Sequence, residues 1–512
     1  MLDGDAGELM ADPDSKQGSV AQSSPYADGL GASVPRVHRR HLPRPAGHQL
    51  VARSARIARS GMRRLGPLSA RQLVHVRDGK GLLPAAVAAR ALREMFEDLG
   101  GTFMKFGQLV ASSPGVFGDG LAEEFRSCLD TGPPVPFQQV RELIEGDLGM
   151  AVRDAFAELE PEPIGRASIA VVHRGRLQDG RVVAVKVLRP GIDRVVATDL
   201  DLLQPLLDIV ARQTGDQTAG SLLQMFDGFR EQIGEELDLR NEARAMIHFR
   251  HLLAGAGLDE VVVPEVVPEL SGPNVLTMEF LDGVPIDDLA SASLYGVDPA
   301  PLVEQVVRAF FLMTLRWGAF HGDVHAGNLL LLRDGRLGVL DWGIVGRLDA
   351  GTYRFFRRVL QAALGDESAW DDVADHMVKT YGPALEEGLG MDRSELAAFF
   401  RSMIEPVLTR PFGEVSLGEL LTAPQAQVAR ARGVEAHSRS IGAVLTRLRA
   451  QRRMRRMAEE HGGMASDFDR GAFLLGKQLL YFERYGKLFM ADTPLLSDRA
   501  FFEGLLAEGE GQ

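Results

Sequence analysis

The sequence predicts an α+β chain of two lobes, with a helical extension before them and a helical region towards the C-terminal end. Within residues 169–281 the apolar pattern first alternates in twos, then repeats every three to four residues, and then forms a short buried run. This indicates a strand hairpin, a helix and a third strand. Within residues 301–340 a helical pattern is followed by two short apolar runs around turn residues. Elsewhere the apolar spacing is mostly helical.

Composition places the chain among ordinary globular proteins. Its 512 residues are 45% hydrophobic and 25% charged, which is enough for more than one globular unit. The single cysteine, Cys128, excludes an internal disulfide and a cysteine-based zinc site, as is typical of a reducing compartment. The most apolar stretch, Pro301–Phe320, contains three charged residues, so no membrane-spanning helix is expected. Since no secretory signal is visible either, we expect a cytoplasmic protein whose membrane contact is peripheral, at the inner face.

The N-terminal segment differs in composition from the rest. Residues 1–47 are rich in Gly, Ser, Pro and Asp and are predicted to be a disordered tail. Residues 36–77 hold eleven Arg and no acidic residue, which is typical of a solvated basic arm. From Leu50 onwards apolar residues are interleaved with Arg, a pattern that also suits an anionic lipid surface. These apolar residues are Leu50, Ile57, Leu65 and Leu68.

Three further parts follow this tail. Residues 48–160 are predicted to form a helical N-terminal extension, in which Ala91–Gln108 has apolar residues at three- and four-residue spacing. Thr131–Pro136 then interrupts the helical pattern. Residues 161–285 are expected to form the first lobe, and residues 286–512 the second, mostly helical lobe.

A lysine in the predicted hairpin indicates a phosphate-binding site. The hairpin strands are Ile169–Arg176 and Arg181–Leu188, and Lys186 lies in the otherwise apolar second strand. An exposed edge-strand lysine is the simpler interpretation of this residue alone. A carboxylate on the following helix would instead hold the ammonium against the phosphates of a nucleotide. Three acidic residues of that helix are alternative partners, although such clusters are also typical of a solvated face. They are Glu236, Asp238 and Glu242.

The turn before the hairpin contains small residues, which let backbone amides approach phosphate oxygens. Small residues before a strand are common, but this turn lies about twenty residues before Lys186, as a phosphate-binding loop would. Its candidate cofactor-binding residues are Gly165, Ala167 and Ser168.

The second lobe carries two carboxylates and an amide at a regular spacing. Asp323 precedes Asn328 by five residues, and Asp341, followed by Trp and Gly, comes thirteen residues after Asn328. These residue types hold magnesium and orient a nucleophile during phosphoryl transfer, and the spacing matches a kinase catalytic loop. We therefore expect Asp323 to be catalytic, Asn328 and Asp341 to be metal ligands, and ATP and Mg²⁺ to be the cofactors.

Two histidines flank Asp323 in the same loop. His321 and His325 could be zinc ligands, but no third His or Cys lies nearby. His321 is therefore expected to hold the loop through hydrogen bonds. The order of elements and the loop spacing together predict a two-lobed protein-kinase-like fold.

Two further strings resemble one family. The loop residues are shared by protein kinases and small-molecule phosphotransferases, and His-Gly-Asp with Asp-Trp-Gly is similar to the aminoglycoside phosphotransferase group. Lys105-Phe-Gly-Gln108 and Glu236-Leu-Asp238, however, resemble the Lys-x-Gly-Gln and Glu-x-Asp motifs of the UbiB-like (AarF) atypical kinase family. The similarity covers roughly residues 90–350 in order, with a weaker echo at Leu479–Tyr485.

The resemblance implies a lid over the nucleotide. Lys105, Gly107 and Gln108 would lie on an extension folded across the cleft, facing Glu236 and Asp238. It also implies that Glu242 pairs with Lys186 and that Glu279, within a shared string, lies at the nucleotide. The implied activity is that of an atypical kinase or ATPase, with magnesium-dependent ATP binding and hydrolysis linked to isoprenoid quinone or other lipid metabolism.

The sequence also departs from the family, and two other functions stay open. The alanine-rich loop of the family is replaced here by Gly165-Arg-Ala-Ser168, which leaves nucleotide preference undefined. One alternative is a small-molecule phosphotransferase of the aminoglycoside type, and the other is a catalytically silent nucleotide-binding scaffold. An Arg run at 447–456 suits a solvated face or an acidic lipid or protein surface. It has no interleaved aromatics, so no nucleic-acid partner is expected. The sequence predicts no oligomeric state.

Overall fold

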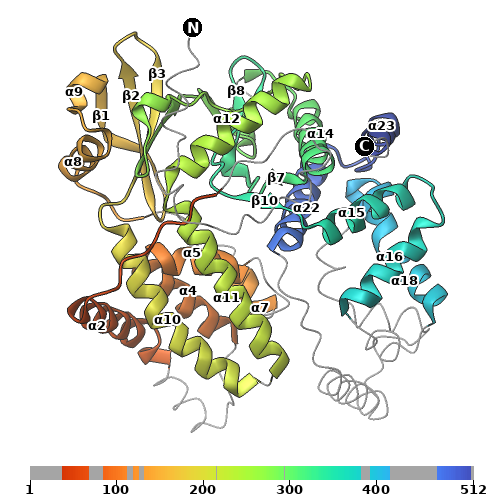
Figure 1. The fold of residues 1–512 in the computed structure, drawn as a ribbon, viewed down its shortest axis with the longest axis horizontal. Coiled ribbons are helices and arrows are strands. Elements are labelled where there is room, and N and C mark those ends of the chain that lie inside the picture. Colours follow the sequence, from red (N-terminus) through yellow and green to blue (C-terminus); the bar gives the residue numbers. More distant parts are fainter. Residues whose placement is uncertain are drawn as a thin grey trace, which may run out of the picture.

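The computed structural model describes residues 37–68, 85–111, 119–125, 132–214, 216–292, 295–381, 392–415 and 470–508. These residues form the α+β, two-lobed kinase-like fold that was predicted, with a block of helices beside it (Figure 1). Residues 1–36 of the expected tail, Cys128 and the Arg run at 447–456 lie outside the described residues.

The first lobe is built on an antiparallel sheet in the order β1-β2-β3-β5. Its strands are β1 (Phe156–Arg166), β2 (Ala170–Leu177), β3 (Val182–Leu188) and β5 (Val275–Glu279). The β2–β3 hairpin is as predicted, and Gly180 supplies the positive φ of 90° that the turn requires. Strand β1 was not predicted, because its two prolines and exposed glutamates suggest a linker. An edge strand tolerates such residues.

Helix α8 (Phe137–Leu148) also belongs to the first lobe. Its Val140 and Ile144 are fully buried against Val171 and Val185 of the sheet. The predicted boundary at residue 161 is therefore too late, and the extension is not helical throughout residues 48–160.

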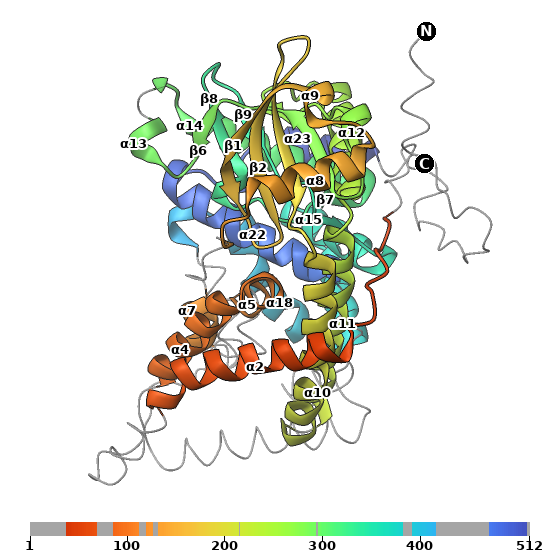
Figure 2. The ribbon, with the colours of Figure 1, turned by 90° about the vertical axis from the view of Figure 1, so that its left-hand side faces the viewer.

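A block of helices lies below the sheet in Figure 1, and α2 runs along its outer side in Figure 2. It combines helices of the extension with two long helices inserted after β3. They are α2 (Gly47–Arg64), α4 (Ala85–Leu99), α5 (Gly101–Ala111), α7 (Asp119–Phe125), α10 (Ile192–Thr214) and α11 (Asp216–Glu236). Phe106 of α5 contacts Phe229 of α11 edge-on, with ring centroids 5.4 Å apart. Apolar packing therefore fixes the extension against the inserted helices.

Residues 37–46 form an extended segment, here called the N-terminal strap, so the predicted disorder is wrong for this part of residues 1–47. The backbone N–H of Arg40 donates to Gly234 O at 3.1 Å, and its guanidinium donates to Leu237 O at 3.0 Å. Asn241 donates to His38 O at 2.7 Å. Prolines prevent a helix here, but these hydrogen bonds hold the segment against the end of α11 and the start of the next helix.

The arginines of α2 are used largely within the protein. Arg53 bonds to the fully buried Asp199 at 2.6 Å, and Arg64 bonds to Asp98 at 2.8 Å. Ile57 packs against the core, so the apolar side that was expected to meet lipid faces the protein instead. The opposite side exposes Val51 and Met62, whose side chains are 71% and 70% accessible.

The second lobe contains two small sheets, in the orders β4-β9-β8-β6 and β10-β7, covered by helices. The strands are β4 (Val261–Val262), β6 (Gly283–Pro285), β7 (Ala319–His321), β8 (Leu329–Leu332), β9 (Leu337–Val339) and β10 (Val345–Arg347). The helices from here and the lobe junction are α12 (Leu239–Gly255), α14 (Pro299–Trp317), α15 (Ala350–Ala363), α16 (Ala369–Tyr381), α18 (Arg393–Thr409), α22 (Arg470–Phe489) and α23 (Arg499–Glu508). Among the residues described, no helix is both long and apolar enough to cross a bilayer.

Helix α22 crosses behind the second lobe and is fixed there by close packing. Phe482 contacts Phe310 of α14 at 4.9 Å between ring centroids. A methyl group added at Gly486 would lie only 2.2 Å from the ring of Phe412. This glycine therefore sets how closely α22 approaches the 3₁₀ turn at Phe412–Glu414.

We expect Gly486→Ala to destabilise the protein by about 1–3 kcal/mol, since the added methyl overpacks the contact with Phe412. Gly476→Ala on the same helix is the matched control, because nothing lies within 4 Å of the added atom. There the higher helix propensity of Ala should raise stability by about 0.5–1 kcal/mol. Urea denaturation measures both, and equal effects of the two changes would contradict the packing described.

Candidate active site

Lys186 lies where the two lobes meet and is bound by two carboxylates. From β3, its ammonium donates to both oxygens of Glu242 at 2.9 and 2.8 Å and to Oδ1 of Asp341 at 3.0 Å. The side chains of Lys186 and Glu242 are 12% and 3% exposed, whereas that of Asp341 is 46% exposed. Of the three acids that the sequence left as alternatives, Glu242 is therefore the partner, and Asp341 keeps an open side.

Burial and neighbouring charges strongly shift the pKa values of Lys186, Glu242 and Asp341. Burial lowers the pKa of Lys186, but the negative charges of Asp341 and Glu242 outweigh it and raise the pKa overall. Burial raises the pKa of Glu242 to about 7, against the opposing effect of Lys186. Desolvation also raises the pKa of Asp341, but Lys186 and Lys105 bring it well below the ordinary value. Asp341 is thus the group that stays an anion near neutral pH.

The region from Glu235 to Glu242 was predicted to be one helix, but it contains a break. Helix α11 ends at Glu236, and Asp238 is the N-cap of α12, accepting from Arg240 N at 3.1 Å. The Arg240 guanidinium bonds to the same carboxylate at 2.6 Å. Asp238 thus fixes the start of the helix that carries Glu242.

Glu236 instead forms an ion pair with helix α5 of the N-terminal extension. Lys105 of α5 bonds to Glu236 at 2.7 Å, and the two side chains are only 14% and 7% exposed. Lys105 also lowers the pKa of both Asp341 and Asp323, so its charge lies close to the cleft. Gly107 is buried in the same helix and Gln108 follows it. The structure therefore places the Lys-x-Gly-Gln helix against Glu236 at the end of α11.

The loop after β7 carries Asp323 and Asn328. Asn328 is 6% exposed, and its amide nitrogen donates to Asp323 O at 2.9 Å. The amide oxygen is then the atom that Asn328 can offer to a cation. Burial raises the pKa of Asp323, but the charges of Lys477 and His325 lower it overall.

His321 connects this loop to Asp341. Its Nδ1 accepts from Asp323 N at 3.0 Å, and its Nε2 donates to Leu340 O at 3.0 Å. Burial lowers the pKa of His321, which keeps the ring neutral as this arrangement requires. The imidazole is therefore a structural bridge, as predicted, between the backbones that carry two of the acidic residues.

Asp341 has a φ of 53°, a left-handed conformation that Asp and Asn tolerate better than most residues. The following residue anchors it. Trp342 is 1% exposed, stacks on Phe249 of α12 at 4.9 Å, and donates to Val339 O at 2.9 Å. Buried packing at Trp342 therefore holds the carboxylate of Asp341 at the cleft.

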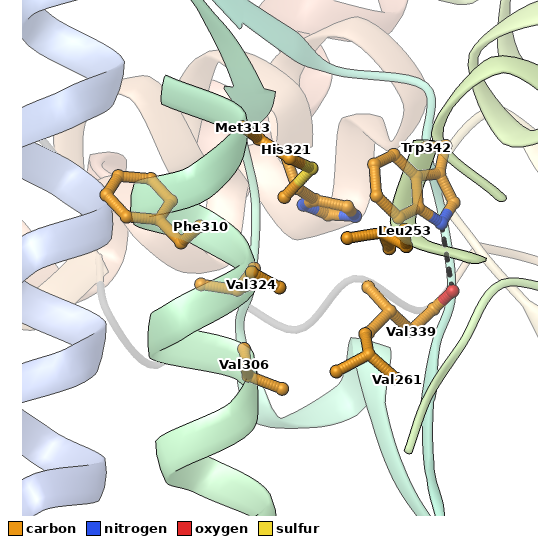
Figure 3. A pocket seen from close by; sticks show the side chains of 10 residues that line it. Leu253, Val261, Val306, Phe310, Met313, His321, Val324, Val339 and Trp342 are labelled. Carbon is orange, nitrogen blue, oxygen red and sulfur yellow. Dashed lines mark hydrogen bonds between the residues drawn. The ribbon is translucent and has the colours of Figure 1, made fainter. Parts of the chain in front are cut away.

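Behind the loop lies a small apolar cavity (Figure 3). His321 and Trp342 form one side, and Phe310, Met313 and Val306 of α14 contribute to the other. Its volume of about 10 Å³ is roughly that of one water molecule, and its lining offers few polar partners. The back of the site is thus a packed apolar wall rather than a place for a nucleotide.

Two groups of predicted cofactor-binding residues have contacts outside this cluster. In the β1–β2 turn, Ser168 is 1% exposed, and Ala167 O accepts from the Arg189 guanidinium at 2.9 and 3.0 Å. Gly165 is a β1 residue paired with Val172. The Glu279 carboxylate accepts from Glu265 N at 3.2 Å and from Arg250 at 3.4 Å.

Sequence reasoning missed the contribution of α22. Lys477 bonds to Asp323 Oδ1 at 2.8 Å, and Gln478 and Tyr485 bond to the loop backbone on either side of it. The weaker family similarity at Leu479–Tyr485 indicated that this helix belongs to the shared fold, but Lys477 and Gln478 precede that stretch. Nothing in the local pattern predicts a contact between residues 154 positions apart.

Comparisons with known proteins find a matching family model, several similar sequences and a similar solved structure. A family model described as the ABC1 atypical kinase-like domain matches residues 127–372. An uncharacterized chloroplastic aarF domain-containing protein kinase of Arabidopsis thaliana is 33% identical over 417 residues, 80% of this chain and 73% of that protein. A probable protein kinase UbiB of Marinobacter nauticus is 31% identical over 334 residues, 64% of this chain and 60% of that protein. Among solved structures, the Rv3197–erythromycin complex from Mycobacterium tuberculosis aligns with a TM-score of 0.45 and 23% identity, over 78% of this chain and 94% of that one.

Proposed function

The chain belongs to the ABC1 atypical kinase-like family, which includes UbiB and aarF domain proteins, and on that premise we propose that it binds ATP with Mg²⁺ and hydrolyses it. The observation that carries the proposal is Lys186 bound at once to Glu242 and to Asp341. A lysine held by a buried carboxylate beside an open one is what positions nucleotide phosphates next to a metal in phosphoryl transfer.

The residues present suit magnesium. Asp341 supplies a carboxylate and Asn328 an amide oxygen, and Mg²⁺ prefers such hard oxygen donors, one or two from the protein and the rest from phosphate and water. When bound, the ion would neutralise charge on the phosphate oxygens. Lys186 would contact the phosphates, and Asp323 would orient the attacking oxygen.

The lid favours hydrolysis over transfer to a large acceptor. The 2.7 Å contact of Lys105 with Glu236 supports a position of α5 at the mouth of the proposed nucleotide site. An open cleft with these two residues far apart would instead have favoured a phosphotransferase of the aminoglycoside type. A lid at this position would admit water or a small molecule but would obstruct a folded protein.

We further propose a link to isoprenoid quinone or other lipid metabolism through peripheral contact with an anionic membrane. The outer side of α2 combines the exposed Val51 and Met62 with Arg59 and Arg63. An apolar stripe flanked by arginines suits the surface of an anionic bilayer.

Steady-state phosphate release from ATP, measured with Mg²⁺ or EDTA and with or without anionic vesicles, tests both the proposed ATP hydrolysis and the proposed membrane contact. We expect release that requires Mg²⁺ and rises with vesicles. Arg59→Gln/Arg63→Gln should weaken vesicle binding roughly 30-fold, from about 1 kcal/mol per lost arginine, and should remove the stimulation.

The matched control is Arg153→Gln/Arg181→Gln in the first lobe, where the side chains are 88% and 55% exposed. It should leave vesicle binding unchanged. Nucleotide binding without release would favour the silent scaffold. Formation of ADP and of a phosphorylated acceptor when a small amine or alcohol is added, without matching release of inorganic phosphate, would favour the phosphotransferase.

A further inference from the structure

One face of helix α22 is directed at the catalytic loop. Lys477, Tyr481 and Tyr485 are four residues apart and Gln478 lies three residues before Tyr481, which places the four along one side of a helix. All four interact with the segment from Gly322 to Val324. A helix near the C-terminal end of the chain thus contributes to the site of Asp323.

Two of these residues hold the backbone of the loop. Gln478 is fully buried; its Oε1 accepts from Val324 N at 3.0 Å and its Nε2 donates to Gly322 O at 2.6 Å. Tyr485 donates its hydroxyl to Val324 O at 2.6 Å. The peptide groups on both sides of Asp323 are therefore bound by α22, which fixes the direction in which the Asp323 side chain leaves the backbone.

The other two residues act on the carboxylate itself. Lys477 Nζ lies 2.8 Å from Asp323 Oδ1. Burial and the nearby Asp323 carboxylate raise the pKa of the Tyr481 hydroxyl. The Lys477 ammonium also lies 5.7 Å from the centre of the Tyr481 ring, a cation–π distance. Lys477 and Asp323 are 19% and 20% exposed, so this pair borders the cleft instead of lying in the core.

We propose that Lys477, supported by Tyr481, is a positioning residue that fixes the carboxylate of Asp323 for phosphoryl transfer, so that α22 completes the active site. The proposal rests on the function proposed above and adds a residue to it. Its physical basis is geometric: a group that must orient an attacking oxygen loses much of its effect if it can rotate, and small misplacements cost large factors in rate. Lys477 restricts that rotation from outside the loop.

The test compares Lys477→Met with the wild type in steady-state phosphate release from MgATP. We expect kcat to fall at least tenfold while KM for MgATP changes less than twofold, because Lys186, Asn328 and Asp341 stay in place. Lys477→Arg should restore part of kcat, since it keeps a cation beside Asp323. Tyr481→Phe should give a smaller fall, because it removes the hydroxyl but keeps the ring.

Lys487→Met is the matched control. Lys487 lies on the same helix, 39% exposed, and its ion pair is with Glu483 of α22 itself. It should leave kcat and KM unchanged. Urea denaturation of every variant establishes that each is folded at the assay temperature.

Three results would overturn the inference: an unchanged kcat in Lys477→Met, a rise in KM without a fall in kcat, or no rescue by Arg. Absence of phosphate release from the wild type would instead refute the proposed function. In that case a double-mutant cycle of Asp323→Asn and Lys477→Met, measured by urea denaturation, tests whether the two side chains interact. Additive changes in the free energy of unfolding would show that they do not.

Discussion

Asp341→Asn should abolish magnesium-dependent nucleotide binding and reduce phosphate release at least about 100-fold. The amide has the size of the carboxylate but no negative charge for the ion, and metal stabilisation of phosphoryl transfer is worth several kcal/mol. Because Asn also tolerates the left-handed backbone at φ 53°, the fold should be retained. Fluorescent nucleotide titration with and without Mg²⁺ measures the binding.

Asp334→Asn makes the same chemical change in the β8–β9 turn. Asp334 pairs with Arg336 at the surface and is 50% exposed. It should bind nucleotide as the wild type does. If Asp341→Asn bound MgATP normally, the site described here would not be a magnesium site.

Lys105→Met should destabilise the protein by about 3–5 kcal/mol, because it leaves the carboxylate of Glu236 buried without its partner. Glu236→Gln should also be costly, since it removes the negative charge that lies 2.7 Å from the buried Lys105 ammonium. The double substitution should cost less than the sum of the two. Urea denaturation of the four proteins gives the coupling free energy.

The pair of Arg333 and Asp282 is the matched comparison. It has the same 2.7 Å separation, but its side chains are 67% and 62% exposed. Arg333→Met should have little effect on unfolding, since water replaces the lost partner. Equal effects at the two pairs would mean that the lid contact is not buried in solution.

Local sequence patterns predicted the charged residues of the site and much of the fold. The strings around Lys186, Asp323 and Asp341 are compact, and their residue types follow from the chemistry of phosphate and magnesium. The β2–β3 hairpin likewise follows from alternation and a turn glycine. Family membership, inferred from Lys105–Gln108 and Glu236–Asp238, is confirmed by the comparisons.

What the sequence did not predict depends on tertiary context. Strand β1 is stabilised by pairing with β2, although its prolines and glutamates give no strand pattern. The N-terminal strap is ordered by hydrogen bonds to α11 and α12, whereas its composition alone predicts disorder. The residue pattern alone left three partners open for Lys186, and only the family resemblance indicated Glu242. The break at Asp238 separates Glu242 from the other two acids.

Gln478 and Tyr485 of α22 hold the backbone around Asp323, and this has a consequence for protein synthesis. Gln478 leaves the ribosome after all the segments that carry Lys105, Lys186, Glu242 and Asp341. A nascent chain can therefore gather its acidic residues and lysines while the peptides flanking Asp323 still lack the side chains that hold them. The proposed ATP turnover should therefore require synthesis through Tyr485, and a chain that stops before residue 477 should lack both these contacts and the packing of Phe482 on Phe310.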